Sequence, residues 1–156
     1  MTQHEHERAA SLQEEMLERV RNAGYARLIG MRILTAEGGI GKASIAVDER
    51  LMHPQMIVHG GVVFTLADTA MSMAVLSVYP PGTRFSTIEA KINFLAPTRT
   101  GELIAEATIL HQGRSTMVLE ASVFNSVEGK NERKLVARML GTFSISLPKT
   151  DGSHAH

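Results

Sequence analysis

Residues 59–78 read HGGVVFTLADTAMSMAVLSV, and this stretch decides the fold. From Val62 to Val78 the chain is apolar on nearly every side, as expected of a helix enclosed by other elements. A single acid, Asp68, interrupts the run, and a buried carboxylate is costly unless something pairs with it. Gly60 and Gly61 precede the run at the expected helix N-terminus, where free backbone N–H groups and the helix dipole favour negative charge. A donor and an acid on one helix indicate a catalytic site.

The composition restricts the class of protein. A chain of 156 residues accommodates one domain with its own core, but not two ordinary ones. Sixteen basic and sixteen acidic residues give a formal charge of zero, which argues against nucleic acid as a partner. Cysteine is absent, so disulfides and thiolate sites are excluded. The charged N-terminus lacks the apolar core of a signal peptide, and polar residues interrupt the long apolar run. We therefore expect a cytoplasmic protein without a membrane partner.

Periodicity and turn residues place further elements around the long helix. An amphipathic helix is expected from about Glu7 to Ala23, followed by a linker-like stretch over residues 25–30. Two strands joined by a glycine turn precede the long helix, and an antiparallel meander of four strands follows it. These strands are expected at Met31–Ala36, Lys42–Val47, Arg84–Phe94, Glu102–Leu110, Ser115–Phe124 and Lys134–Ile145. Because an apolar helix needs a surface that encloses it, we predict an α+β fold with a curved antiparallel sheet of five to six strands wrapped round it.

The stretch Arg84–Phe94 alternates between apolar and polar residues. One face is expected to carry Ile88, Ala90, Ile92 and Phe94, and the other Thr87, Glu89, Lys91 and Asn93. A long strand of this kind at a sheet edge can pair with a second copy of the chain. We therefore expect a homodimer with a continuous sheet.

Four polar residues of the long helix follow the i, i+3, i+4, i+7 spacing and form one narrow stripe. They are Thr65, Asp68, Thr69 and Ser72. Asp68 is either a structural acid, hydrogen-bonded to the backbone or to a base such as Arg84 or Lys91, or a catalytic group. Gly60 lies about 12 Å from Asp68 along the helix, whereas a donor and a base that act on one carbonyl both lie about 3 Å from it. A second copy with its helix antiparallel to the first would bring Gly60 of one chain to Asp68 of the other.

Three segments together resemble a known family. They are Gly30-Met31-Arg32-Ile33, the motif at residues 59–70, and Asn93-Phe94-Leu95-Ala96-Pro97. The region from Ala26 to Ile145 is similar to the hotdog-fold acyl-CoA thioesterases of the phenylacetate-pathway (PaaI-like) type. Together with the amphipathic N-terminal pattern and the polar end of the chain, the resemblance predicts an N-terminal helical extension at 1–25, a hotdog thioesterase domain at 26–147 and a flexible tail at 148–156. It also implies hydrolysis of acyl-CoA without a metal or redox cofactor, by a homodimer or homotetramer.

The same resemblance implies roles for individual residues. The Gly60 N–H would polarise the thioester carbonyl, and Asp68 would act as a base or as a nucleophile. His53 and Met56 stand where family members often carry Asn and Gly, so His53 is a candidate for the hydrogen bond that Asn supplies. Thr87 is a candidate hydroxyl brought by the following strand from the partner subunit. Candidate substrate-binding residues are His59, Gly61, Gln55, Thr69, Ser86, Lys91 and Arg114.

Two other functions use the same residues. A non-catalytic acyl-CoA sensor on this fold would usually carry a DNA-binding module, for which the first 25 residues are too few and too neutral. A hydratase or dehydratase acting on enoyl thioesters would use His53 or His59 together with Asp68. The remaining histidines have no spacing that fits a zinc site, since His111 stands alone and the other four lie near the chain ends.

Overall fold

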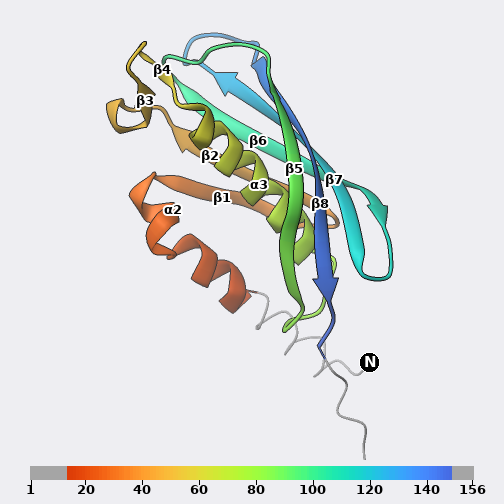
Figure 1. Ribbon diagram of the computed structural model, residues 1–156. Helices are drawn as coiled ribbons and strands as arrows, with labels where there is room; N and C mark the ends of the chain where they lie inside the picture. Colours follow the sequence, from red (N-terminus) through yellow and green to blue (C-terminus); the bar gives the residue numbers. More distant parts are fainter. Residues whose placement is uncertain (1–13, 149–156) are drawn as a thin grey trace, which may run out of the picture.

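The computed structural model describes residues 14–148. One long helix, α3 (Gly60–Leu76), lies across one face of a twisted antiparallel sheet (Figure 1). Six strands form this sheet in the order β1-β2-β6-β7-β8-β5. Their bounds are Met31–Glu37 (β1), Ile40–Ala46 (β2), Arg84–Phe94 (β5), Glu102–Gln112 (β6), Thr116–Ser126 (β7) and Lys134–Ser146 (β8). The α+β fold expected from the sequence, with a six-stranded curved sheet round one central helix, is confirmed.

The order of the strands differs from the expected meander of four. Strands β6, β7 and β8 are consecutive neighbours, but β5 pairs with β8 and not with β6. Residues 95–101 therefore cross from one edge of the sheet to its interior before β6 begins. The alternation of apolar and polar residues along one strand predicts which face of that strand is covered. It does not predict which strand lies next to it. As predicted, β5 lies at an edge of the sheet.

Short elements fill the regions outside the sheet and α3. Residues 14–21 are helical, and the helix expected to reach Ala23 ends two residues earlier. Residues 7–13 of that expected helix, residues 149–156 of the expected tail and the four terminal histidines lie outside the described residues. A second short helix, α2 (Gly24–Leu28), occupies most of the stretch that the sequence suggested was a linker, so that expectation was wrong. A 3-10 turn, η1 (Glu49–Leu51), leads into a hairpin of β3 (Met52–His53) and β4 (Ile57–Val58).

Small residues hold α3 against the sheet at very close range. Ala67, Ala70 and Ala74 are fully buried on the side of α3 that faces the strands. A Cβ atom at Gly41 of β2 would lie only 1.9 Å from the Ala70 carbonyl oxygen, so this position accepts no side chain. Within residues 14–148, no helix is long and apolar enough to cross a membrane.

A β-bulge interrupts the alternation of β5. Thr87 is opposite Phe143 and Glu89 is opposite Thr142, so Ile88 is an extra residue on the β5 side. Before the bulge Phe85 is half-buried, and after it the half-buried positions are Ala90 and Ile92. Ile88 itself is 58% exposed, so its expected place on the covered face was wrong. The bulge leaves Thr87 on the face of the sheet that carries α3.

Candidate functional site

The N-terminus of α3 presents a free backbone donor. His59 is the N-cap, and its Nδ1 accepts a hydrogen bond from the Gly61 N–H at 2.9 Å. The Val62 N–H donates to the His59 carbonyl oxygen at 2.9 Å. Among the described residues, the Gly60 N–H has no acceptor. Because it stands at the positive end of a helix of 17 residues, it is suited to bind an oxygen that carries negative charge.

A cavity of about 410 Å³ opens directly beside Gly60. The ring of Phe94, at the end of β5, is part of its wall, and a Cβ atom added at Gly60 would lie 3.1 Å from that ring. The cavity walls come from β4, the first turn of α3, the end of β5 with the residues that follow it, and β8. They are Ile57, Val58, Gly60, Val63, Phe94, Leu95, Ala96, Pro97, Thr98 and Val136. An apolar space therefore adjoins the free donor.

Asp68 lies in the middle of α3 and is held by a hydroxyl from β5. The Thr87 Oγ1 donates a hydrogen bond to the Asp68 Oδ1 at 2.7 Å. The bulge at Ile88 explains this contact, because it leaves Thr87 on the helix side of β5. Both residues belong to the same chain, so Thr87 and Asp68 would enter a shared site together. Within residues 14–148, Asp68 forms no ion pair with Arg84, Lys91 or any other base.

The polar stripe of α3 has a second neighbour that the sequence did not suggest. The Tyr25 hydroxyl of α2 shares a hydrogen bond of 3.1 Å with the Thr65 Oγ1, one helical turn before Asp68. Thr65, Asp68, Thr69 and Ser72 are all half-buried, whereas the side of α3 that faces the sheet is buried. Tyr25 on one side and Thr87 on the other therefore flank the stripe. A helical period in α2 was the only sequence signal that could have placed this tyrosine beside the stripe. The five residues of α2 are too few to show such a period.

His53 and Gln55 lie on the hairpin that precedes α3. The His53 Nδ1 accepts a hydrogen bond from the Gln55 N–H at 3.3 Å, which leaves the His53 Nε2 as the second polar atom of the ring. The ring centroids of His53 and His59 are 6.1 Å apart. Met56, at the tip of the hairpin, has a φ of 58°, which glycine adopts without strain and a methionine does not. The structure thus places His53 near His59, the N-cap of α3.

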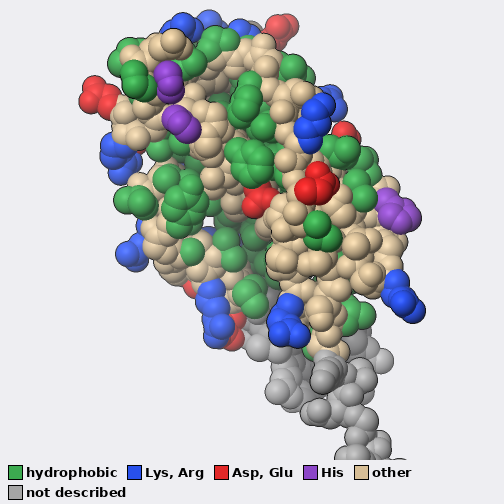
Figure 2. Space-filling model, viewed as in Figure 1, with side chains coloured by type: hydrophobic (Ala, Val, Ile, Leu, Met, Phe, Trp, Pro, Cys, Tyr) green, Lys and Arg blue, Asp and Glu red, His purple; other side chains and the backbone are tan. Residues whose placement is uncertain are grey.

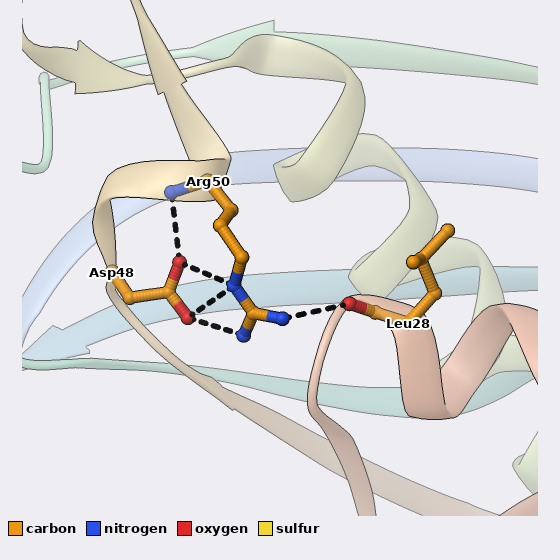
Figure 3. A network of polar contacts seen from close by, with 3 residues as sticks. All are labelled: Leu28, Asp48 and Arg50. Atoms are coloured by element: carbon orange, nitrogen blue, oxygen red, sulfur yellow. Dashed lines mark hydrogen bonds and ion pairs between the residues drawn. The ribbon is translucent and has the colours of Figure 1, made fainter.

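A network of charged groups fixes the start of this hairpin to α2 (Figure 3). Asp48 caps η1 by accepting from the Arg50 N–H at 2.9 Å, and the Arg50 Nη2 donates to the Asp48 Oδ2 at 2.6 Å. The Arg50 Nη1 donates to the Leu28 carbonyl oxygen at the end of α2, at 3.4 Å. Hydrogen bonding to Arg50 holds the pKa of Asp48 below its usual range, so the carboxylate stays charged at neutral pH. The loop that positions His53 is therefore connected to the helix that carries Tyr25.

Three of the candidate residues form no side-chain hydrogen bond with Gly60 or Asp68, the two candidate catalytic groups of α3. The Ser86 hydroxyl bonds to the Ser144 hydroxyl across β5 and β8 at 2.9 Å, on the face opposite Thr87. Lys91 on β5 and Arg114 in the loop between β6 and β7 are exposed, and neither forms a hydrogen bond or ion pair through its side chain with another described residue. On the face that carries α3 and β5, Figure 2 shows histidines near the β3–β4 end, acidic side chains further along, and hydrophobic side chains between them.

Residues 55–131 match the thioesterase superfamily. The chain is 30% identical over 121 residues to the acyl-coenzyme A thioesterase PaaI of Escherichia coli, and the aligned region covers 77% of this chain and 81% of that protein. The chain belongs to the thioesterase superfamily. It is a thioester hydrolase, as the resemblance implied.

Further relatives agree with this membership of the superfamily. The 1,4-dihydroxy-2-naphthoyl-CoA hydrolase of Listeria monocytogenes is 30% identical over 105 residues, which cover 67% of this chain and 85% of that protein. The solved structure of Escherichia coli PaaI matches with a TM-score of 0.74 and 26% identity over 87% of this chain and 94% of that chain. A thioesterase family protein from Silicibacter pomeroyi matches with a TM-score of 0.78 and 25% identity, over 90% of this chain and 99% of that chain. The hotdog fold and the PaaI-like type expected from the sequence are confirmed.

Proposed function

We propose that this thioesterase hydrolyses the thioester of an aryl- or fatty-acyl-CoA to the free acid and coenzyme A. Two of its relatives are named for the hydrolysis of acyl-CoA esters, which supports coenzyme A as the leaving group. The observation that carries the proposal is the Asp68–Thr87 pair, a half-buried carboxylate held by a hydroxyl on the polar stripe of α3. This carboxylate is placed on a helix face that the sheet leaves uncovered.

Asp68 supplies the reacting oxygen or the base. As a base it removes a proton from water, whose oxygen adds to the thioester carbon while coenzyme A leaves as the thiol. As a nucleophile its oxygen displaces the sulfur of coenzyme A, which takes up a proton and leaves as the thiol, and forms an anhydride with the acyl group. Water then cleaves this anhydride to the free acid and the Asp68 carboxylate. Thr87 donates to the Asp68 Oδ1 and so orients the carboxylate in either case. The Gly60 N–H stabilises the negative charge that develops on the carbonyl oxygen.

The two groups serve one substrate only across two chains. Eight residues of α3 separate Gly60 from Asp68, which corresponds to about 12 Å along the helix axis. We propose a homodimer, or a dimer of dimers, in which Gly60 of one chain faces Asp68 of the other. Apolar side chains on and just after the edge strand β5 favour this pairing, since Ile88, Phe94 and Leu95 are each more than half exposed in one chain.

The other groups near the N-terminus of α3 assist this chemistry in the proposal. His53 takes the place of the Asn of family members, with its Nε2 free to donate a hydrogen bond to the substrate or to water. His59 holds the Gly61 N–H, which leaves the Gly60 N–H as the free donor. Lys91 and Arg114 remain candidates for the phosphates of coenzyme A. We further propose that the reaction needs no metal or redox cofactor, so that activity survives exhaustive treatment with a chelator.

Release of free thiol from a panel of aryl- and fatty-acyl-CoA esters tests the function. We expect turnover by the full chain and a fall in kcat of at least about a thousandfold in Asp68→Ala, within the range for loss of a general base. The control is Glu106→Gln, which alters an acid on the opposite face of the sheet and should leave kcat unchanged. Wild-type turnover by Asp68→Ala would exclude this role for the acid. Hydration of an enoyl thioester without thiol release would favour a hydratase instead.

A further inference from the structure

Tyr25 reaches from α2 to the polar stripe of α3. Its hydroxyl shares a hydrogen bond of 3.1 Å with the Thr65 Oγ1, and the tyrosine is 57% exposed in one chain. Because an exposed hydroxyl can bond to water, this contact is not required to satisfy a buried polar group. The docking of α2 does not depend on it either, since Ala26 is buried and the Leu28 carbonyl oxygen accepts from the Arg50 Nη1. The contact is therefore available to serve the reaction.

The two hydroxyls leave one O–H for a third group. Tyr25 and Thr65 have two hydroxyl hydrogens between them, and their shared hydrogen bond uses one, whichever group donates. Within residues 14–148, neither hydroxyl has another hydrogen-bond partner. The second O–H of the Tyr25–Thr65 pair is therefore a donor that faces the stripe.

Asp68 offers the matching acceptor one helical turn further along α3. Its Oδ1 accepts from Thr87, and within residues 14–148 its Oδ2 forms no hydrogen bond. Residues three apart on a helix have Cβ atoms about 5–6 Å apart, so Thr65 and Asp68 are neighbours on the stripe. Two hydrogen bonds of about 2.8 Å in series span such a gap, which is the arrangement of one bridging water molecule.

We propose that Tyr25 is a positioning residue that acts through Thr65 to hold the attacking water against Asp68. The inference rests on the proposed function and selects its general-base form. The water accepts the second O–H of the Tyr25–Thr65 pair and donates one of its own protons to the Asp68 Oδ2. As that proton passes to Asp68, the water oxygen adds to the thioester carbon. The carbon–sulfur bond then breaks, and coenzyme A takes the proton from Asp68 and leaves as the thiol.

The two neighbours of the stripe have separate tasks in this arrangement. From β5, Thr87 orients the carboxylate, and from α2, on the other side of α3, Tyr25 and Thr65 orient the water (Figure 1). A water held by Asp68 alone is free to rotate about that one hydrogen bond. A second hydrogen bond fixes the direction of the lone pair that attacks, and alignment of this kind lowers the barrier without tighter substrate binding.

Tyr25→Phe and Thr65→Val test this assignment by thiol release from the acyl-CoA ester that the wild-type protein hydrolyses fastest. We expect each variant to lower kcat about tenfold, the factor for one neutral hydrogen bond, with KM unchanged. The double variant should lose no more than either single variant, because the two hydroxyls act as one unit. Thr65→Ser, which keeps the hydroxyl, should recover most of the loss. Because Tyr25 is exposed, the melting temperature of Tyr25→Phe should stay close to that of the wild type.

Tyr79→Phe is the matched control. Tyr79 is the second tyrosine of the chain; it follows α3, packs against the core, and its hydroxyl forms no hydrogen bond with the described residues. This variant should keep the wild-type kcat. Wild-type kcat in Tyr25→Phe would overturn the inference and leave the proposed function intact. A raised KM at unchanged kcat, or losses that add in the double variant, would do the same. Absence of thiol release by the wild-type protein would overturn both.

Discussion

The two sides of α3 differ in how closely they pack and in the polarity of their side chains. Towards the sheet, the helix is lined by alanines and lies so close to β2 that Gly41 has no space for a Cβ atom. Between the edge strand β5 and α2, it carries a half-buried polar stripe; within residues 14–148, only Tyr25 and Thr87 form side-chain hydrogen bonds with this stripe. Close packing on the first side fixes the backbone of α3 against the sheet. The stripe residues are therefore free to serve chemistry, and changes on the two sides should affect different properties.

The largest effect on activity, after loss of Asp68, is expected from Gly60→Pro. This change removes the backbone N–H and leaves the backbone path intact, because proline is well tolerated at the first position of a helix and His59 already has an extended backbone with φ −61° and ψ 135°. We expect kcat to fall about 10²- to 10³-fold, as for loss of one oxyanion donor. Steady-state thiol release measures it, with thermal unfolding as the check on the fold.

Gly60→Ala is the control for that substitution. It adds the same Cβ near the Phe94 ring, at 3.1 Å, but keeps the N–H. It should therefore lose far less activity than Gly60→Pro. Equal kcat values for the two variants would show that crowding at Phe94, and not the N–H, is responsible.

Gly41→Ala should disrupt the packing of α3 against β2 and lower the stability of the protein. Its Cβ would lie 1.9 Å from the Ala70 carbonyl oxygen and 2.5 Å from the Ala74 nitrogen, so the strand and the helix must separate. We expect a loss of about 3 kcal/mol in the free energy of unfolding, at the upper end for overpacking. Urea titration measures this loss. Gly24→Ala, where a Cβ meets nothing within 4 Å, is the control, and a similar loss there would refute the packing argument.

Thr87→Val should reduce activity without reducing stability to the same extent. The variant keeps the shape of the side chain but removes the O–H that donates to Asp68 at 2.7 Å. We expect kcat to fall about tenfold, which corresponds to one neutral-donor hydrogen bond of about 1.4 kcal/mol. Thr87→Ser should recover most of the loss, because it restores the hydroxyl. If the valine variant turns over at the wild-type rate, Thr87 does not orient the acid.

The smallest effect is expected on the outer face of the sheet, away from both sides of α3. A hydrogen bond from Arg133 at 2.8 Å, with Lys42 nearby, holds the pKa of Glu106 below its usual range. This stabilisation is present above the ordinary glutamate pKa of about 4.3 and is lost as the pH falls through the lowered value of the folded state. Glu106→Gln should cost about 0.5 kcal/mol at pH 7, and progressively less as the pH falls below about 4, when measured by urea unfolding. A difference that does not change with pH would contradict this account.

Much of this architecture could be predicted from local sequence pattern, and the exceptions have physical causes. The long helix and the strands were found within a few residues, because apolar periodicity reports burial directly. The bulge at Ile88 was not predictable from the sequence. One inserted residue reverses the face of the sheet to which each later side chain points, but it leaves the number of apolar residues in the strand unchanged. The pairing of β5 with β8 was missed because it depends on contacts far apart in the sequence. Tyr25 was missed because α2 is too short to show a helical period.

The candidate site, too, could be predicted only in part from the sequence. Asp68, Gly60 and the polar stripe follow from one stretch of sequence, because helical spacing alone puts them where they are. The contact of the Thr87 hydroxyl with Asp68 was not predicted, since the side to which a strand residue points depends on the bulge beside it. Thr98, in the cavity wall, was not predicted as a site residue. Nothing about a threonine that follows a proline indicates that its hydroxyl will be buried without a partner among residues 14–148.

The central claim is that Gly60 and Asp68 act across two chains, and mixing two inactive variants tests it most directly. Gly60→Pro and Asp68→Ala are purified separately, unfolded together in equal amounts and refolded, and thiol release is measured. Half of the resulting dimers are mixed, and each mixed dimer holds one site with an intact Gly60 and an intact Asp68. We therefore expect recovery of about a quarter of the wild-type activity per chain, by the statistics of a two-fold dimer. No recovery, with mixed dimers demonstrated by mass, would place both groups in the same chain's site and contradict the claim.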